Sequence, residues 1–472
     1  MVIGLPVLLK IIKKELIHNY MEILRNANEV YVSMLGINVI DSTKSYRWNK
    51  LITSVEIDNG KVMFNGLTRA IIFLTNDELE SVCDMKTYEF LYRAYFLVYK
   101  DFNEYDSVKQ IRSKLQTPVD DLYLSQINRY TILTTLACNA RCNYCYELGI
   151  KARHIMSNAT ALKVAEYIAA HSDINSPISL DWFGGEPLVN TKAIDLITNY
   201  LASRNYTFYS DMISNGYLFD EKMIKKAKNN WKLRGIQITL DGTEETYNTT
   251  KNYVNPKGSP YVRVLENIQM LINNGITVSV RLNVGEENGP NLLELVDELN
   301  LIFGARSGLQ IYCHALFDDD NVKSEEQNSL IYSYIQAIED KLREYEFSVG
   351  KSVGENMMLC QCMADDGSSV MIDPMGRMGT CEHYLDKDFI GNINNTEWDM
   401  QVLKDWHVYL DDLDICSNCP VYADCLRPKK CMELKHCDNV IKNYRIKEFE
   451  SGLKRFYIDY RMYNMMPNVL ML

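Results

Sequence analysis

Hydrophobic positions are most regularly spaced between residues 126 and 345, where short apolar runs alternate with amphipathic stretches. The apolar runs predict strands, which cover 129–136, 177–183, 206–214, 234–240, 276–284 and 308–316. The stretches between them repeat apolar residues at helical spacing, over 157–172, 191–203, 261–274 and 291–303. Ser157 stands at the N-cap position of the first of these helices. Six strand–helix units predict an α/β section in which a parallel sheet carries its helices outside, as an open, partial (β/α)6 barrel.

The sections on either side of the predicted barrel follow other patterns. In residues 1–125, apolar and polar positions alternate over 51–74 around the turn sequence Asp-Asn-Gly, which predicts a hairpin. Helical patterns follow this hairpin, so we expect a small N-terminal α+β module. Residues 346–440 are dense in cysteine. Residues 441–472 are rich in Tyr and Met and predict a helical tail that packs on the domain surface.

Composition places the chain among globular proteins and narrows its partners. Its 472 residues correspond to about three domains, and 47% hydrophobic with 24% charged residues suffice for a large buried core. The formal net charge of −12 argues against non-specific binding to nucleic acid or anionic membranes. The opening run MVIGLPVLLKIIKKELI has no basic segment before it and no clear cleavage site after it, and no run is long enough to span a membrane. We therefore expect a cytoplasmic protein with neither nucleic acid nor membrane as a partner.

The placement of the thirteen cysteines indicates metal binding rather than disulfides. Cys83 and Cys313 stand alone, while Cys138, Cys142 and Cys145 follow the first predicted strand with C-x3-C-x2-C spacing. Structural zinc sites and ordinary iron–sulfur clusters use four protein ligands. Three thiolates therefore suggest a [4Fe–4S] cluster whose fourth iron is left for a small chelating ligand. The alternatives are a zinc site with a distant fourth ligand and a loop whose cysteines share no function.

The cysteine trio, with Tyr144 just before its last member, resembles the signature of the radical S-adenosylmethionine (SAM) family. After the second predicted strand, Gly184, Gly185 and Glu186 in WFGGEPL resemble the family's GGE motif, which implies contact with the amino group of SAM. The residue types suit this role, because glycine permits close backbone approach and a carboxylate suits an ammonium group. Loops after the carboxyl ends of parallel strands are also where such folds place their sites.

The third and fourth predicted strands carry further matches to the family pattern. ISNG after the third strand resembles the ribose-side motif, which implies SAM contacts from Ser214 and Asn215. ITLDG after the fourth strand resembles the S-x-D-G segment, with Thr239 in place of the serine and Asp241 at the aspartate. The resemblance thus extends the expected cofactor site across four neighbouring strand ends.

Two positions depart from the family pattern, which usually continues with His and Arg. Tyr247 and Lys251 stand at the corresponding spacing here. Lysine can pair with a carboxylate of SAM as a point charge, without the bidentate fork of arginine. Arg281 and Asn283, at the end of the fifth strand, are weaker candidates whose alternative role is that of ordinary polar residues at the barrel mouth.

The second cysteine field, in residues 346–440, resembles a SPASM domain, an extension that binds two auxiliary [4Fe–4S] clusters. By motif order, the resemblance implies one cluster on Cys360, Cys362, Cys381 and Cys431. It implies the other cluster on Cys416, Cys419, Cys425 and Cys437. The chain has five residues between Cys425 and Cys431 where the family usually has three, and Cys360 lies unusually close to Cys362. Two structural zinc sites are the alternative, because C-x2-C pairs also form zinc knuckles.

The resemblance also implies a mechanism. A reduced cluster and SAM give a 5′-deoxyadenosyl radical that abstracts hydrogen from the substrate, and the protein orients SAM and excludes water. An electron donor such as flavodoxin or ferredoxin would supply the reducing electron. Relatives that form formylglycine carry an aspartate base after the second auxiliary ligand, and Glu382 takes that place here, followed by His383. Glu382 and Asp241 are our acid–base candidates, with a structural role for Glu382 and His383 as the alternative.

The N-terminal 125 residues exceed what a barrel and a SPASM domain need. A short sheet followed by helices resembles the leader-recognition module of peptide maturases, which adds an extended leader to a sheet edge; a structural cap is the alternative. We expect a maturase that joins a cysteine thiol of a ribosomally made precursor peptide to an unactivated carbon as a thioether. Carbon–carbon cross-linking, epimerisation, anaerobic sulfatase maturation and a zinc-stabilised peptide-binding adaptor are the alternatives.

Overall fold

The computed structural model describes most of the chain. The described residues are 21–36, 44–57, 59–80, 85–122, 127–149, 153–316, 322–347, 349, 353–383, 388–395, 397–434 and 436–469. The apolar opening run and Cys83 lie outside them.

A sheet of parallel strands forms the centre of the molecule and confirms the six strands that the sequence predicts. In chain order they are β7 (Arg129–Thr135), β8 (Ile178–Gly184), β9 (Phe208–Ile213), β10 (Leu233–Thr239), β11 (Thr277–Val284) and β12 (Leu309–Ala315). Each strand pairs in parallel with the next one along the chain. All six carboxyl ends therefore meet at one rim of the sheet, where the predicted site residues follow them.

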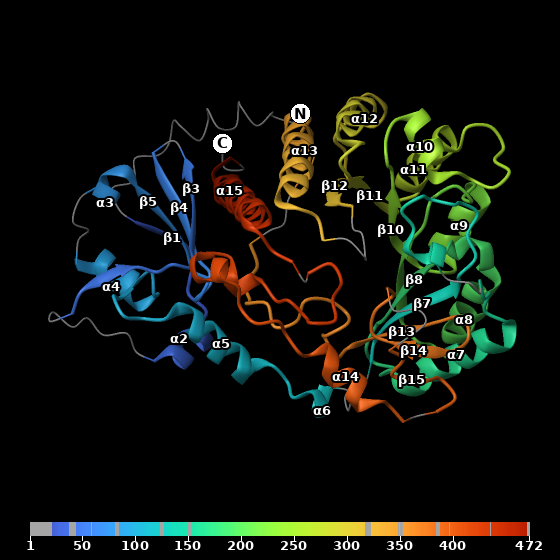
Figure 1. Ribbon diagram of the computed structural model, residues 1–472, viewed down its shortest axis with the longest axis horizontal. Helices are drawn as coiled ribbons and strands as arrows, with labels where there is room; N and C mark the ends of the chain where they lie inside the picture. Colours follow the sequence, from blue (N-terminus) through green and yellow to red (C-terminus); the bar gives the residue numbers. More distant parts are fainter. Residues whose placement is uncertain are drawn as a thin grey trace.

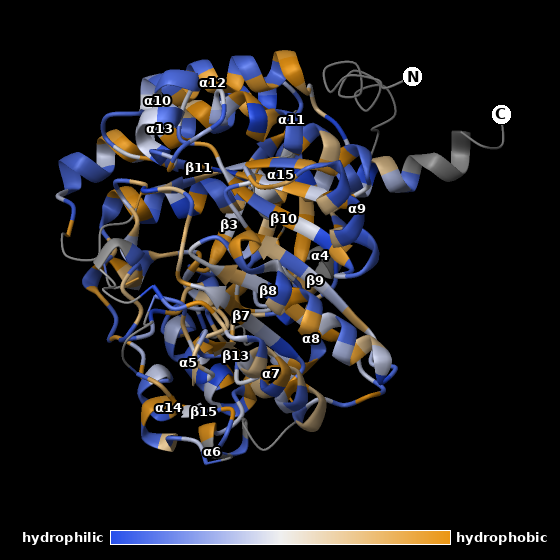
Figure 2. Ribbon diagram, turned by 90° about the vertical axis from the view of Figure 1, so that its right-hand side faces the viewer, coloured by the Kyte–Doolittle hydropathy of each residue, from blue (hydrophilic) through white to orange (hydrophobic). Residues whose placement is uncertain are grey.

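Helices cover the outer face of this sheet (Figure 1). They are α7 (Asn158–His171), α8 (Thr191–Ser203), α9 (Glu221–Asn229), α10 (Glu244–Lys251), α11 (Pro260–Asn273), α12 (Gly289–Ile302) and α13 (Glu325–Glu344). Ser157 caps α7 as predicted, since its Oγ accepts a hydrogen bond from the backbone N–H of Thr160 at 3.0 Å. The outer helices mix hydrophilic and hydrophobic positions (Figure 2), as expected when one side of each helix packs on a sheet.

Alternation along β8 separates its packed face from a more polar face. In β8, Ile178, Leu180 and Trp182 are fully buried, whereas Ser179 and Asp181 point to the other side. Asp181 and its neighbours near the strand starts line one polar pocket, together with Arg129, Tyr209, Asp211 and Arg234.

The cysteine-rich segment continues the central sheet rather than forming a sheet of its own. β13 (Ser369–Ile372) pairs in parallel with β7, and the short strands β14 (Arg377–Gly379) and β15 (Gly391–Asn392) follow in antiparallel order. In the described chain this segment also contains α14 (Met400–Trp406). It lies between the barrel and the N-terminal module (Figure 1).

The N-terminal module contains the predicted hairpin. β3 (Ile52–Ile57) and β4 (Gly60–Asn65) pair antiparallel in a four-stranded sheet of order β1-β5-β4-β3, with β1 (Glu22–Arg25) and β5 (Ile71–Thr75). Asp58, in the predicted turn, lies outside the described residues. A second, two-stranded sheet joins β2 (Tyr46–Trp48) to β6 (Leu97–Tyr99). The helices of the module are α2 (Glu29–Leu35), α3 (Asn76–Glu80), α4 (Met85–Arg93), α5 (Glu104–Leu115) and α6 (Val119–Leu122).

The C-terminal tail is the helix α15 (Asn439–Val469), as the sequence predicts. Its side chains pack on one face of the N-terminal sheet, where Leu453 and Tyr457 join a core with Phe64 and Phe73. The two ends of the chain are therefore joined by a common core. Among the described residues, no helix is both long and apolar enough to cross a membrane.

A buried ion pair in the N-terminal module gives a prediction for pH. Burial alone would raise the pKa of Glu104, but hydrogen bonds from Arg47 and from the backbone N–H of Lys50, at 2.9 Å, outweigh it and hold the pKa below its ordinary value. The carboxylate therefore stabilises the module above the unfolded-state pKa of about 4.3, and this contribution is lost as pH falls through the folded-state pKa. We expect Glu104→Gln to cost about 1–3 kcal/mol at neutral pH and progressively less in acid. Hydrogen exchange of the β2 and β6 amides measures this loss of stability and its dependence on pH. A difference between the variant and the parent that does not change with pH would contradict this account.

Candidate active site

The three cysteines of the predicted signature lie in the loop that leaves the carboxyl end of β7. Their turn is closed by a hydrogen bond from the Cys145 N–H to the Cys142 carbonyl, at 3.2 Å. Cys138 also accepts a hydrogen bond on its Sγ from the N–H of Ala140, at 3.4 Å. All three thiols are free and partly exposed. The fold therefore places three thiols on one short loop at the rim of the sheet.

Arg141 fixes this thiol loop (residues 138–145) from within. Its guanidinium donates to the carbonyls of Cys138 and Ala140, at 2.8 and 2.7 Å. Its backbone N–H donates to the carbonyls of Lys251 and Asn252, at 2.9 and 3.1 Å, so the loop is tied to the end of α10. This role could not be predicted from the sequence, because the contacts with Lys251 and Asn252 connect distant parts of the chain.

The electrostatics of the thiol loop suit metal ligands. Burial raises the pKa of all three thiols, and that of Cys138 rises to about 12, with the nearby Glu186 as the next cause. Such thiols are poor nucleophiles on their own, because the thiolate is the reactive form. A bound cation or cluster would supply the positive charge that stabilises the thiolates. The donor set therefore fits an iron–sulfur cluster.

The GGE motif brings β8 against the segment that leads to the thiol loop. The N–H groups of Gly185 and Glu186 donate to the carbonyls of Thr135 and Ala137, both at 3.0 Å. Gly184 has a φ of +117°, and a Cβ there would lie 2.2 Å from the Thr135 carbonyl oxygen. A Cβ on Gly185 would lie 2.6 Å from that of Ala137. The two glycines thus permit close approach of the protein's own backbone.

Glu186 is a buried carboxylate without a cationic partner among the described residues. It accepts hydrogen bonds from the Ser214 hydroxyl and from the backbone N–H groups of Asn215 and Leu188, at 2.9, 2.9 and 3.1 Å. Burial nevertheless raises its pKa to about 7, because these hydrogen bonds offset only part of the desolvation. An ammonium group bound here would supply the missing positive charge. The site therefore fits the amino group of a SAM methionyl moiety.

The other predicted cofactor residues lie at the same rim with their polar groups already engaged. The Ser214 hydroxyl donates a hydrogen bond to the Glu186 carboxylate. Asn215 donates from Nδ2 to the Oδ1 of Asn139 in the thiol loop, at 2.7 Å. Thr239 ends β10, two residues before Asp241. The structure thus gathers the motifs of β8, β9 and β10 around the thiol loop, as the parallel order predicts.

Asp241 is the centre of a buried polar network beside the cysteines. Its carboxylate pairs with Lys251 Nζ at 2.8 Å and accepts from the Tyr144 hydroxyl at 2.8 Å and from Asn283 Nδ2 at 3.2 Å. Lys251 also donates to the Tyr144 hydroxyl at 2.7 Å. Asp241 and Lys251 are 1% and 4% exposed, so both charges are held inside the protein. This geometry favours positioning of the thiol loop as the task of both residues.

Two more of the candidates from the sequence, Tyr247 and Arg281, lie around this network. Tyr247 is fully buried, and its hydroxyl lies 2.9 Å from that of Tyr253. Arg281 donates from Nε to the Oδ1 of Asn283 at 2.9 Å, so it orients the amide that contacts Asp241. Tyr247 therefore acts within the protein, whereas Arg281 is partly exposed.

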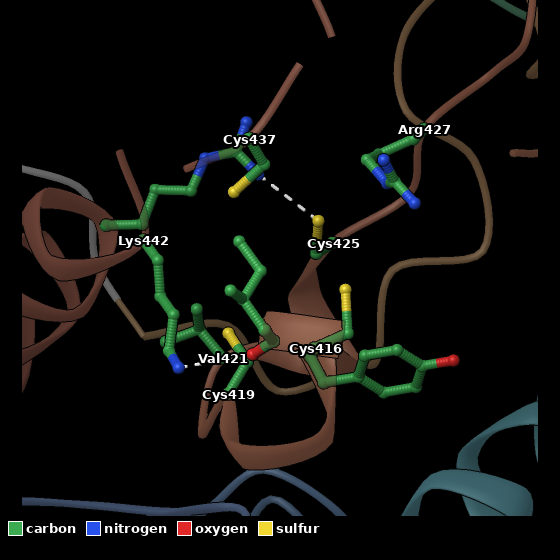
Figure 3. A pocket seen from close by; sticks show the side chains of 10 residues that line it. Cys416, Cys419, Val421, Cys425, Arg427, Cys437 and Lys442 are labelled. Carbon is green, nitrogen blue, oxygen red and sulfur yellow. Dashed lines mark hydrogen bonds between the residues drawn. The ribbon is translucent and has the colours of Figure 1, made fainter. Parts of the chain in front are cut away.

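In the cysteine-rich segment, four thiols face one cavity (Figure 3). They are Cys416, Cys419, Cys425 and Cys437, the four that the sequence assigns to one auxiliary cluster. Two residues of α15 close the cavity: Arg445 donates to the Sγ of Cys425 at 3.2 Å, and Lys442 donates to the Ile415 carbonyl at 3.1 Å. Four convergent thiols and nearby cations fit an anionic cluster with four protein ligands.

The other predicted set of cysteines is Cys360, Cys362, Cys381 and Cys431, and in the described chain fewer contacts connect its members. Burial raises the pKa of Cys362 to about 12, with nearby Asp365 and Cys431 as further causes. Burial also raises the pKa of Cys381 above its ordinary value, and Glu382, Cys362 and Cys431 add to the shift. Cys362, Cys381 and Cys431 therefore lie close together. Burial and Asp365 raise the pKa of Cys360, and the same carboxylate accepts from the hydroxyl of Tyr409 at 3.0 Å.

The segment after Cys381 reaches the thiol loop of the barrel. His383 stacks on Tyr146, with ring centroids 4.3 Å apart. Burial raises the pKa of Tyr146 far above its ordinary value, and Glu147 and Glu382 add to the shift. Glu382, our acid–base candidate, therefore lies near the end of the thiol loop, at the junction between the barrel and the cysteine-rich segment.

Sequence reasoning missed a second contact across this junction. His314, at the end of β12, pairs through Nε2 with Glu433 at 3.0 Å, two residues beyond Cys431. In the parallel register His314 lies beside Asn283, which contacts Asp241. The only available signal was a histidine at a strand end, which is too common to indicate a site by itself.

Comparison with known families agrees with this geometry. Residues 132–299 match the sequence model of the Radical SAM superfamily. This part of the chain is a radical SAM domain. It contains the thiol loop, Glu186 and the Asp241 network, so a [4Fe–4S] cluster and SAM are the cofactors that the family implies. The protein is thus a radical SAM enzyme.

Individual relatives extend the similarity beyond the radical SAM domain. The chain is 19% identical over 354 residues to the radical SAM cyclopropyl synthase TigE of Paramaledivibacter caminithermalis, covering 69% of this chain and 70% of TigE. Its fold is similar to that of anSMEcpe, an anaerobic sulfatase-maturing enzyme, with bound AdoMet (TM-score 0.55, 16% identity, 71% of this chain and 100% of that chain). It is also similar to Streptococcus suis SuiB bound to the precursor peptide SuiA (TM-score 0.50, 14% identity, 84% and 100%). At these identities, the solved structures establish a radical SAM α/β fold with a mostly parallel sheet.

Proposed function

We propose that this radical SAM enzyme modifies a precursor peptide. The observation that carries the proposal is the placement of three free thiols beside Glu186, a buried carboxylate with no cationic partner in the described part of the chain. Cys138, Cys142 and Cys145 would hold the cluster, and Glu186 would orient the SAM amino group. When bound, the cluster and SAM supply the 5′-deoxyadenosyl radical. Ser214, Asn215 and Thr239 are the proposed further contacts to SAM.

The two cysteine sets of residues 346–440 are proposed as a SPASM domain with two auxiliary clusters. The common cavity of Cys416, Cys419, Cys425 and Cys437 supports one of them. The proximity of Cys362, Cys381 and Cys431 supports the other, with Cys360 as the proposed fourth ligand. Together with the cluster of the barrel, these would make three clusters.

A cysteine-containing precursor peptide is the proposed substrate. A fold shared with SuiB, whose structure holds a precursor peptide, supports this class of substrate. The proposed reaction replaces one C–H and one S–H bond by a C–S bond. The hydrogen atom would go to 5′-deoxyadenosine and the thiol proton to a base such as Glu382. The remaining electron would pass to one of the proposed auxiliary sites, such as that of Cys416, Cys419, Cys425 and Cys437.

The N-terminal module, residues 1–125, is the proposed site for the leader of that peptide. β1 and β3 are the edges of its four-stranded sheet, and an extended leader could add a strand to β3. The barrel, residues 126–345, would then act on the core of the peptide. A flavodoxin or ferredoxin is the proposed electron donor.

Co-expression with a short cysteine-containing precursor encoded beside the gene tests the proposal. We expect the peptide mass to fall by one pair of hydrogen atoms and one thiol to resist alkylation, because a thioether consumes both. The matched control is the same expression with Glu186→Gln, which removes the carboxylate but keeps its shape. An unchanged peptide mass with both enzymes would contradict cross-linking.

The same measurement separates the alternatives. A carbon–carbon cross-link gives the same mass loss but leaves the thiol open to alkylation. Epimerisation leaves the mass unchanged and alters the configuration of one residue. Sulfatase maturation, which the shared fold with anSMEcpe supports as a second candidate, would convert a cysteine of a sulfatase peptide to formylglycine.

A further inference from the structure

The N-terminal module and the cysteine-rich loop of residues 416–425 share one hydrophobic core. Val108 and Ile111 of α5 are packed in the same cluster as Tyr422 and Ala423, which lie between Cys419 and Cys425. The ring of Tyr105 meets the ring of Tyr422 edge-on, with centroids 5.0 Å apart. Figure 1 shows α5 running alongside the cysteine-rich segment. The loop that carries three of the four thiols thus has the N-terminal module as one of its walls.

Arg112 of α5 holds the backbone of this loop. Its guanidinium donates to the carbonyls of Tyr422, Ala423 and Cys425, at 3.1, 2.8 and 3.2 Å, and to that of Met358 at 3.1 Å. The side chain is only 7% exposed. Carbonyls at residues 422, 423 and 425 that all point to one cation orient the peptide planes just before Asp424 and just after Cys425. The backbone around Cys425 is therefore restrained by Arg112.

Arg112 binds backbone carbonyls of this loop, whereas Arg69 holds the side chain of Asp424. It forms a bidentate ion pair with Asp424, at 2.7 and 2.9 Å, and is 1% exposed. It donates further to the carbonyls of Gly66 and Gly354, at 3.3 and 3.0 Å. A bidentate pair of this kind sets orientation as well as energy. Two buried arginines of the N-terminal module therefore bind neighbouring residues of the loop: Arg69 pairs with Asp424, and Arg112 donates to the Cys425 carbonyl.

Helix α15 completes the connection from the opposite side. Arg445 contacts the Sγ of Cys425 near the start of the helix, whereas Leu453 and Tyr457 pack on the N-terminal sheet. Beyond them, Arg461 pairs with Glu22 on β1 at 2.9 Å. A single helix thus touches both the thiol cavity and the module.

We propose that the N-terminal module is a structural part of the auxiliary site formed by Cys416, Cys419, Cys425 and Cys437, with Arg112 and Arg69 as its positioning residues. The inference rests on the proposed assignment of a cluster to these thiols. A cluster needs its thiolates preorganised, and an isolated loop would lose conformational freedom on binding it. The module provides that order before the cluster is bound, and Arg112, which donates its hydrogen bonds to carbonyls, adds positive charge near an anionic group.

Replacing Arg112 tests this proposal in the full-length protein. After anaerobic reconstitution, Arg112→Ala should contain about one third less iron and sulfide than the parent, which corresponds to one cluster of three. Arg112→Lys keeps the charge but cannot reach three carbonyls, so we expect an altered electron paramagnetic resonance spectrum of the reduced cluster even where iron is retained. If Arg112→Ala does not fold, as judged by circular dichroism, the lysine variant decides the question alone. Full iron and an unchanged spectrum in the folded variants would overturn the proposal.

Glu104→Gln is the matched control. Glu104 lies on the same helix and is 1% exposed, but its partners, Arg47 and Lys50, belong to the N-terminal module. It should destabilise the module without loss of iron. Equal loss of iron in this control would mean that general stability, rather than the arginine contacts, holds the cluster, and would overturn the assignment of Arg112.

The parent protein separates this inference from the proposed function. The unmodified protein could contain iron and sulfide for only two clusters, with no further loss when Cys416 and Cys419 are replaced by alanine. This result would show that these thiols do not hold a cluster. Three clusters in the parent and three in Arg112→Ala would leave the proposed function intact and remove only the role of the module.

Discussion

Replacing Cys138, Cys142 and Cys145 together by alanine should abolish reductive cleavage of SAM and leave the auxiliary iron in place. The three thiols lie on one loop at the rim of the sheet, and the loop is held by contacts of Arg141 and Asn215 that do not involve the sulfur atoms of Cys142 or Cys145. We therefore expect the loop to keep its course while the cluster is lost. Production of 5′-deoxyadenosine should fall to the background, and iron should fall by about one third, from about twelve to about eight per chain.

Cys313 provides a matched control for the loss of thiols. It is a lone cysteine on β12, and burial raises its pKa well above the ordinary value, so the reactive thiolate form is disfavoured. Cys313→Ala should keep all the iron and the SAM cleavage rate. Cleavage that persists in the triple variant would show that the site is elsewhere, and zinc in place of iron and sulfide would favour the peptide-binding adaptor.

The elements of the barrel could be predicted because their signals are local. Each strand is a short apolar run with a turn or helix after it, and parallel order then brings all strand ends to one rim. Ser157 caps its helix and the hairpin of β3 and β4 forms, because both depend on a few neighbouring residues. The short helices α9 and α10 were not predicted, because each spans nine residues or fewer and consists mostly of polar residues.

The tertiary relations could not be predicted, because the sequence contains no record of which distant groups meet. Ser-Val-Met-Ile at 369–372 is too short to identify as a strand, yet it pairs with β7 and joins the cysteine-rich segment to the barrel. Arg112 is an ordinary arginine on an amphipathic helix until the loop after Cys419 is placed against it. Spacing alone could locate Lys251, but only the structure shows that Asp241 and Tyr144 take its hydrogen bonds.

The contacts between distant residues change what an N-terminal truncation would test. From the sequence alone, a truncation of residues 1–120 should weaken precursor binding and spare slow SAM cleavage, provided that the barrel still folds. The structure adds that the truncation would also remove Arg69 and Arg112 from the loop before Cys425. Single substitutions on the outer edge of β3 are therefore the cleaner test of leader binding.

Replacing Lys251 by methionine should destabilise the radical SAM domain by about 3–5 kcal/mol, because it leaves the buried carboxylate of Asp241 without its cation. Lys251 is 4% exposed and the ion-pair distance is 2.8 Å, so solvent screens the interaction little. Urea unfolding of the protein without its clusters measures the loss. Asp241→Leu combined with Lys251→Met should cost less than the sum of the single changes, by about 0.5–3 kcal/mol, since the double variant buries no lone charge.

Lys251→Arg distinguishes a positioning role from direct contact with SAM. If Lys251 bound the SAM carboxylate, arginine would restore the fork of the family pattern and lower the KM for SAM. In the structure, Nζ lies within hydrogen-bond distance of both Asp241 and the Tyr144 hydroxyl, inside a fully packed space beside Tyr247. The larger guanidinium should therefore overpack this space and destabilise the protein by about 1–3 kcal/mol without lowering that KM. Tighter SAM binding at unchanged stability would return Lys251 to the cofactor site and leave Asp241 free for acid–base chemistry.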